Sequence, residues 1–143
     1  MSLSTTMTFF SEGWAFYCEE LMEELGYIDA PIQRLGRLSD QLWRAGRIIL
    51  DVSLHTRGMS VDDAMAFLVD KCHLEPDDAC AEVRRYTGTP TQPQSYLMGK
   101  LLILDLVDDY RSAYPDATLQ ETHDAIMACG SLPPRLMRRQ LLG

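Results

Sequence analysis

Several features that mark common classes of protein are absent from this 143-residue chain. No apolar run is long enough to cross a bilayer, because the longest, YLMGKLLILDLV, contains Lys100 and Asp105 and is typical of a buried helix. Basic residues are scarce, and the formal net charge of −8 argues against a phosphate-backbone partner. Their one cluster is the short stretch RLMRRQ at 135–140. We therefore expect neither a nucleic-acid partner nor a membrane partner.

The cysteines form no recognisable metal or disulfide pattern. Cys18, Cys72, Cys80 and Cys129 include no C-x-x-C pair and lie in helix-like stretches, which favours reduced thiols over a disulfide framework or a zinc knuckle. The N-terminus also lacks the charged, apolar and cleavage-site regions of an export signal. The default expectation is a cytoplasmic location.

Complete catalytic motifs are missing as well. The three histidines, His55, His73 and His123, include no pair four residues apart, and the HExxH motif is absent. There is no G-x-S-x-G elbow and no glycine-rich phosphate loop. By itself the chain shows no complete zinc site, and each lone histidine is more often a surface or packing residue than a ligand.

What the chain does contain is a series of helical patterns. No stretch alternates apolar and polar residues between hairpin turns, so we expect an all-α bundle of about six or seven helices. Residues 1–10 are expected to be an N-terminal tail or an artificial boundary, and residues 11–143 a single helical domain. The expected helices begin near Ser11 (as N-cap), Pro31, Ser60, Pro76, Ser95 and Thr118, with a short one at the C-terminus.

The first expected helix opens with an unusual Glu12-Gly13 pair. Glu12, Glu19 and Glu23 lie opposite the apolar side of this helix, and the plainest interpretation is a solvated acidic face. Glycine costs about 1 kcal/mol relative to alanine inside a helix. Gly13 is therefore a candidate for close approach of a neighbouring helix, and Gly36 and Gly46 in the second helix suggest the same.

A second set of polar residues shares one face of the second helix. Arg44, Arg47, Asp51 and His55 follow one another at spacings of three and four. They could form a ladder of surface ion pairs, each worth roughly 0.3–0.5 kcal/mol, or a network that holds a site residue in place. The spacing does not choose between these two interpretations.

Two tyrosines flank the irregular segment TPTQPQ, whose two prolines break any helix. Tyr86 and Tyr96 could both face one cleft there, although tyrosines at such positions are more often packing residues. A functional tyrosine would donate a hydrogen bond to a developing oxyanion.

Taken in order, the segments EGWAFYCEEL, GRLSDQLWRAGRIILDVSLHTRGMSVDDAMAFL, EVRRYTGTPTQPQSYLMGKLLIL and THDAIMACGSLPPRLMRRQL resemble the C-terminal part of the bacterial DUF885 family over about residues 11–140. That family looks like a set of all-helical zinc metallopeptidases with a gluzincin site, related to the M32 carboxypeptidases and the angiotensin-converting-enzyme type. The resemblance implies the fold of the C-terminal helical part of an M32- or M3-like enzyme.

The resemblance also implies roles for individual residues. A gluzincin holds its zinc with two histidines of HExxH and a downstream glutamate, and the resemblance places that glutamate at Glu12. It places the oxyanion-stabilising tyrosine at Tyr96 and a substrate contact at Tyr86. The residues expected to hold these site residues in position are Glu19, Arg47, Asp51 and His55.

Two departures from the family pattern shape the functional expectation. Only eleven residues precede Glu12, so the two histidine ligands and the general base are missing, and Pro90-Thr91-Gln92 stands where the family usually has Pro-Gly-Gln. We expect a fragment of a metallopeptidase that binds zinc tightly and cleaves a peptide-like substrate only together with the missing N-terminal catalytic half. The alternative is a non-enzymatic helical interaction module, such as a homodimer, that uses the surface the missing half would cover.

Overall fold

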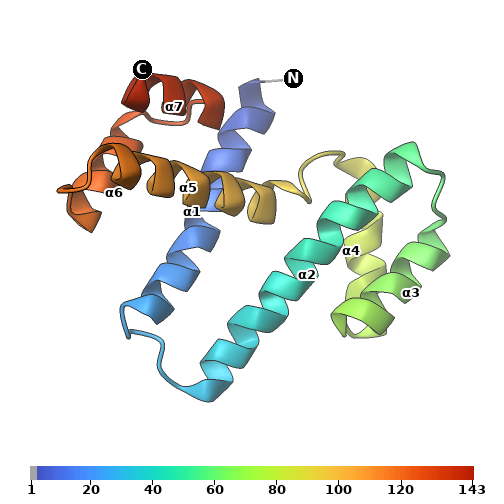
Figure 1. The fold of residues 1–143 in the computed structure, drawn as a ribbon. Coiled ribbons are helices and arrows are strands. Elements are labelled where there is room, and N and C mark those ends of the chain that lie inside the picture. The colour runs from blue at the N-terminus through green and yellow to red at the C-terminus, as the bar shows by residue number, and fades with distance from the viewer. Residues whose placement is uncertain (1–2) are drawn as a thin grey trace.

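The computed structural model describes residues 3–143, with side chains described from Thr8 onward. This part of the chain folds into seven α-helices and contains no strand, which confirms the all-α expectation (Figure 1). The helices are α1 (Leu3–Glu24), α2 (Pro31–Thr56), α3 (Val61–Cys72), α4 (Pro76–Gly88), α5 (Ser95–Ala113), α6 (Leu119–Ala128) and α7 (Pro134–Leu142).

Local sequence signals mark the starts of five helices: α2, α4 and α7 begin with a proline, and α3 and α6 have side-chain caps. The Ser60 side chain accepts a hydrogen bond from the backbone N–H of Asp63 at the start of α3. Thr118 and Glu121 form a complete capping box at the start of α6. The prediction of Ser11 as an N-cap is wrong, because α1 begins at Leu3 and Ser11 lies inside it, with its hydroxyl near the carbonyl of Thr8.

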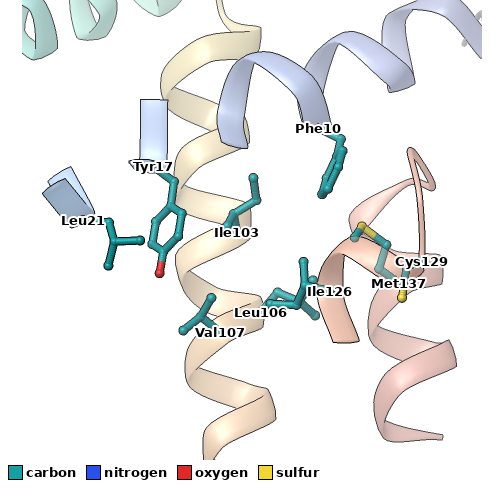
Figure 2. Packing of buried hydrophobic residues seen from close by; sticks show 9 residues of the cluster. All are labelled: Phe10, Tyr17, Leu21, Ile103, Leu106, Val107, Ile126, Cys129 and Met137. Atoms are coloured by element: carbon teal, nitrogen blue, oxygen red, sulfur yellow. The ribbon is translucent and has the colours of Figure 1, made fainter. Parts of the chain in front are cut away.

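Two groups of helices each bury their own hydrophobic cluster. In the first, α1 crosses α5, and α6 and α7 pack beside them; Figure 2 shows Tyr17 and Leu21 of α1 lying against Ile103 and Val107 of α5. In the second, α2 packs against α3 and α4 around side chains that include Leu50 and Leu68, both fully buried. The long helix α2 extends beyond α3 and α4 toward its own N-terminus (Figure 1).

The crossing of α1 and α5 depends on two glycines. A Cβ atom added to Gly13 would lie 2.4 Å from the carbonyl carbon of Gly99, and one added to Gly99 would lie 2.2 Å from the carbonyl oxygen of Phe9. The two backbones are therefore in direct contact, which confirms the close approach expected at Gly13. Gly46 also allows close packing, since its Cβ would meet the sulfur of Cys72 at 2.5 Å, whereas Gly36 has nothing within 4 Å and the expectation there is wrong.

Two findings bear on the broad class of the protein. Within the part of the chain that the structure describes, no helix is both long enough and apolar enough to cross a membrane. All four cysteines are free thiols, and burial raises the pKa of Cys18, Cys72 and Cys129, which makes them poor nucleophiles.

Candidate functional site

Arg47 joins α2 to both tyrosines that flank the proline segment. Its side chain is almost completely buried, its Nε donates a hydrogen bond to the Tyr86 hydroxyl at 3.0 Å, and its Nη2 lies 3.3 Å from Glu82. Its guanidinium carbon also lies 4.9 Å from the centre of the Tyr96 ring. Arg47 is thus a bridge between helices and not part of a surface ladder.

Asp51, one turn further along α2, holds the proline segment. Asp51 is 3% exposed, and its carboxylate accepts the backbone N–H of Thr91 at 3.0 and 3.2 Å. Burial raises the pKa of Asp51, although the Thr91 hydrogen bond and His55 favour the charged form. His55 in turn lies 3.6 Å from this carboxylate and donates from Nε2 to the carbonyl oxygen of Tyr86 at 3.1 Å. We call Arg47, Asp51, His55 and Tyr86 the Arg47 network.

The segment that the Arg47 network holds has an uncommon backbone conformation. Thr91 has a φ of 73°, in the left-handed region that favours glycine. This is the position at which the resemblance to DUF885 leads us to expect glycine. The chain therefore keeps the turn with a β-branched residue, and the two hydrogen bonds from Thr91 to Asp51 help to maintain it.

Tyr86 is a core residue in this structure. It is fully buried, and its hydroxyl accepts hydrogen bonds from Trp43 and Arg47. Burial raises the pKa of Tyr86 to about 12, against the lowering effect of Arg47. Burial also opposes ionisation of the neighbouring Glu82, but hydrogen bonds from Arg85 and Tyr86 hold the pKa of Glu82 below its usual value. Contact of Tyr86 with a substrate stays a prediction.

Tyr96 differs from Tyr86 because it is only half-buried. It lies in the first turn of α5, where its hydroxyl accepts a weak hydrogen bond from Gln92 at 3.4 Å. Its ring is faced by the guanidinium groups of Arg47 and Arg44, at 4.9 and 5.7 Å. Nearby positive charge favours the build-up of negative charge on an acceptor bound beside this ring.

The two glutamates of α1 expected at the site are not held in place by other side chains of the described residues. Glu12 and Glu19 are half-buried, and neither side chain makes a hydrogen bond or ion pair with another residue in the described range. Glu23, the third glutamate of that face, is not solvated, because it pairs with Arg34 at 3.0 Å and with Arg37 at 2.5 Å on α2. Residues 3–143 contain no group of three histidine, cysteine, aspartate or glutamate side chains that could hold a metal ion.

Sequence patterns did not predict a second buried cation, Lys100, in addition to Arg47. Lys100 on α5 is 1% exposed, forms an ion pair with Glu20 of α1 and donates to Gln41 of α2 at 3.1 Å. Its ammonium nitrogen also lies 4.7 Å from the centre of the Phe16 ring. The one signal in the sequence was the lysine that interrupts an otherwise apolar run, since a buried lysine requires such partners.

A hollow of about 620 Å³ lies at the opposite end of α5 from Tyr96. It is lined by residues that include Tyr110, Tyr114 and Glu121. None of the predicted site residues lines it, so its position gives no support to a site there.

Comparison with known protein families gives a match over residues 1–141 to DUF885, described as a bacterial protein of unknown function. The chain belongs to the DUF885 family. A comparison with curated proteins finds no match.

Two solved structures share the fold of this DUF885 chain. One is described as "the putative lipoprotein from Colwellia psychrerythraea" and is 32% identical, with a TM-score of 0.87 over 94% of this chain. The other, "a putative lipoprotein of unknown function from Shewanella oneidensis", is 31% identical, with a TM-score of 0.86 over 94% of this chain. The match covers 23% and 25% of these two proteins, so the chain spans about a quarter of their length.

Proposed function

We propose that the chain is the C-terminal part of a zinc-dependent metallopeptidase and contributes one carboxylate ligand, Glu12, and one oxyanion-stabilising hydroxyl, Tyr96. The observation that supports this proposal is the crossing of α1 and α5. Glu12 is adjacent to Gly13, and Tyr96 precedes Gly99 by three residues, so both lie within one turn of the point where the backbones touch. The helix crossing thus supports the proposal by bringing the two segments that carry Glu12 and Tyr96 close to each other.

The described residues do not fit zinc by themselves. Catalytic zinc needs three protein ligands, and Glu12 has no histidine, cysteine or second carboxylate grouped with it in residues 3–143. The remaining ligands would come from other parts of a longer protein; the two solved relatives are about four times as long as the matched region. Activity, substrate and metal are accordingly proposals for that longer protein, and the substrate class is a peptide or similar amide.

The test compares this chain with the longest natural protein that contains it. Bound zinc is measured by elemental analysis, and hydrolysis is measured on a mixture of unlabelled peptides by mass spectrometry. Glu12→Gln should abolish stoichiometric zinc in the longer protein, and the matched control Glu24→Gln, at an exposed position on the same helix, should not. Stoichiometric zinc in the short chain, or hydrolysis unchanged by Glu12→Gln, would contradict the proposal.

The role of Tyr96 needs a separate readout. Tyr96→Phe should lower kcat about 10²–10³-fold, as loss of one oxyanion donor does, with little change in KM. The control is Tyr27→Phe, because Tyr27 is 77% exposed in the loop between α1 and α2. Equal rates for both variants would remove Tyr96 from the proposal while leaving Glu12 untouched.

An interaction module is the second candidate. It is favoured by apolar side chains that remain exposed along α2, including Leu35 at 61% and Ile49 at 51%. Such a module would form a homodimer in solution, which light scattering measures directly.

A cytoplasmic location also stays a prediction. The lipoprotein descriptions of the two relatives weigh against it, and fractionation of cells that carry the native gene would test it.

A further inference from the structure

One face of α2 carries a row of exposed apolar residues. Leu35, Leu42 and Ile49 recur every seven residues, and Leu38 follows Leu35 by three, so all four lie within about 60° of the helix circumference. Their exposed fractions are 61%, 43%, 51% and 45% for Leu35, Leu42, Ile49 and Leu38. We call these four residues the α2 row. Ile32, on the adjoining turn, is 74% exposed.

The α2 row adjoins the face of α2 that is already packed. Leu50 and Arg47 are buried against α3 and α4, and Gly46 is covered by the side chains of Cys72 and Phe67. A helix in water normally presents polar residues away from its packed face. Here an apolar row beside the packed face stays about half exposed in the described part of the chain, over about 21 Å from Leu35 to Ile49.

The polar residues beside the α2 row indicate what kind of surface fits it. Arg34 and Arg37 are both paired with Glu23 of α1, so their charges are already balanced within the chain. An acidic partner would gain little from them. The spacing of three, four and seven residues instead suits the apolar face of another helix.

The size of the solved relatives indicates where such a helix would come from. About three quarters of each relative lies outside the region that this chain matches, while the matched region keeps the same fold with TM-scores of 0.87 and 0.86. We propose that the α2 row is the surface on which the remaining three quarters of a DUF885 protein packs, through an apolar helix face. This inference rests on the family membership and is independent of zinc or peptidase activity.

The experiment uses a fusion in which this chain replaces the matched quarter of the Colwellia psychrerythraea protein. The double variant Leu35→Asp/Leu42→Asp disrupts the α2 row, and Met127→Asp/Leu136→Asp is the matched control, because Met127 and Leu136 are 47% and 48% exposed on α6 and α7. In the isolated chain each pair should shift the thermal midpoint by no more than about 4 °C, since surface substitutions have small effects. In the fusion the α2 variant should lower the midpoint or the soluble yield several times more than the control does.

Equal behaviour of the two double variants in the fusion would overturn the proposal. A second outcome would assign the α2 row to another copy of this chain. In that case the isolated chain forms a discrete dimer by light scattering and becomes monomeric with Leu35→Asp/Leu42→Asp. The same double substitution then has no effect on the fusion. If the fusion does not fold, carbene footprinting of the unaltered Colwellia protein decides. Side chains aligned with the α2 row should then be protected relative to those aligned with Leu136, and equal labelling would overturn the proposal.

Discussion

Replacing Gly13 by alanine tests the tight backbone contact between α1 and α5. The new Cβ would lie 2.4 Å from the Gly99 carbonyl carbon and 2.6 Å from its Cα, whereas ordinary contacts begin near 3.4 Å. Both neighbouring atoms are backbone, so no side chain can rotate away. The helices would have to separate by about 1 Å, a gap that loses a quarter to a half of the dispersion attraction across the interface.

The size of the effect follows from two opposing terms. Overpacking a well-packed contact typically costs 1–3 kcal/mol. The upper end, about 3 kcal/mol, is appropriate here because the contact between α1 and α5 is the most extensive between any two helices of the described chain. Alanine recovers up to about 1 kcal/mol of helix propensity. We therefore expect a net loss of about 2 kcal/mol, equivalent to a fall of about 4–8 °C in Tm.

Thermal and urea unfolding followed by circular dichroism measures this loss. Gly36→Ala is the control, because it makes the same substitution inside α2 at a glycine with nothing within 4 Å of the added atom. It should stabilise the protein by about 0.5–1 kcal/mol through helix propensity alone. Gly99→Ala should resemble Gly13→Ala, and the double variant should cost less than the sum, since one separation relieves both clashes. A Gly13→Ala protein as stable as Gly36→Ala would refute the reasoning.

Two further predictions concern the proline segment and the α1–α6 contact. Thr91→Gly should raise the free energy of unfolding by about 0.5–1 kcal/mol, because it relieves a φ of 73° that costs a β-branched residue about 1–2 kcal/mol. The control Thr89→Gly should destabilise the protein, because Thr89 has a φ of −134° and its hydroxyl donates to a carbonyl. A higher free energy of unfolding in both variants would contradict the strain argument. Burial lowers the pKa of His123, which is hydrogen-bonded to Tyr17 at 2.8 Å, so the folded state binds fewer protons and stability should fall as the pH drops below about 6.5 toward the folded pKa. His123→Gln should flatten that decline in unfolding experiments between pH 7 and 5, and an unchanged slope would exclude His123 as its source.

The Arg47 network illustrates how far spacing could predict the site. Spacing places Arg47, Asp51 and His55 on one face of a helix, and it left open whether they form surface pairs or support a neighbouring segment. The tertiary structure decides the geometry, because α4 and the proline segment pack on that face and bury Arg47 and Asp51. The partners of these side chains lie 31 to 40 residues away, beyond the reach of any local pattern.

The sequence by itself determined the helical class and most of the helix boundaries, since caps, prolines and glycines act through hydrogen bonds and backbone angles within a few residues. It failed at the start of α1, where Ser11 has the chemistry of a cap but lies inside a helix whose core residue Phe10 packs against other elements. Only the tertiary structure decided which helices touch, which glycines are contact points and which apolar face of α2 stays uncovered. Those properties depend on the summed packing of distant segments, and the acidic and apolar periodicities of a single helix do not contain them.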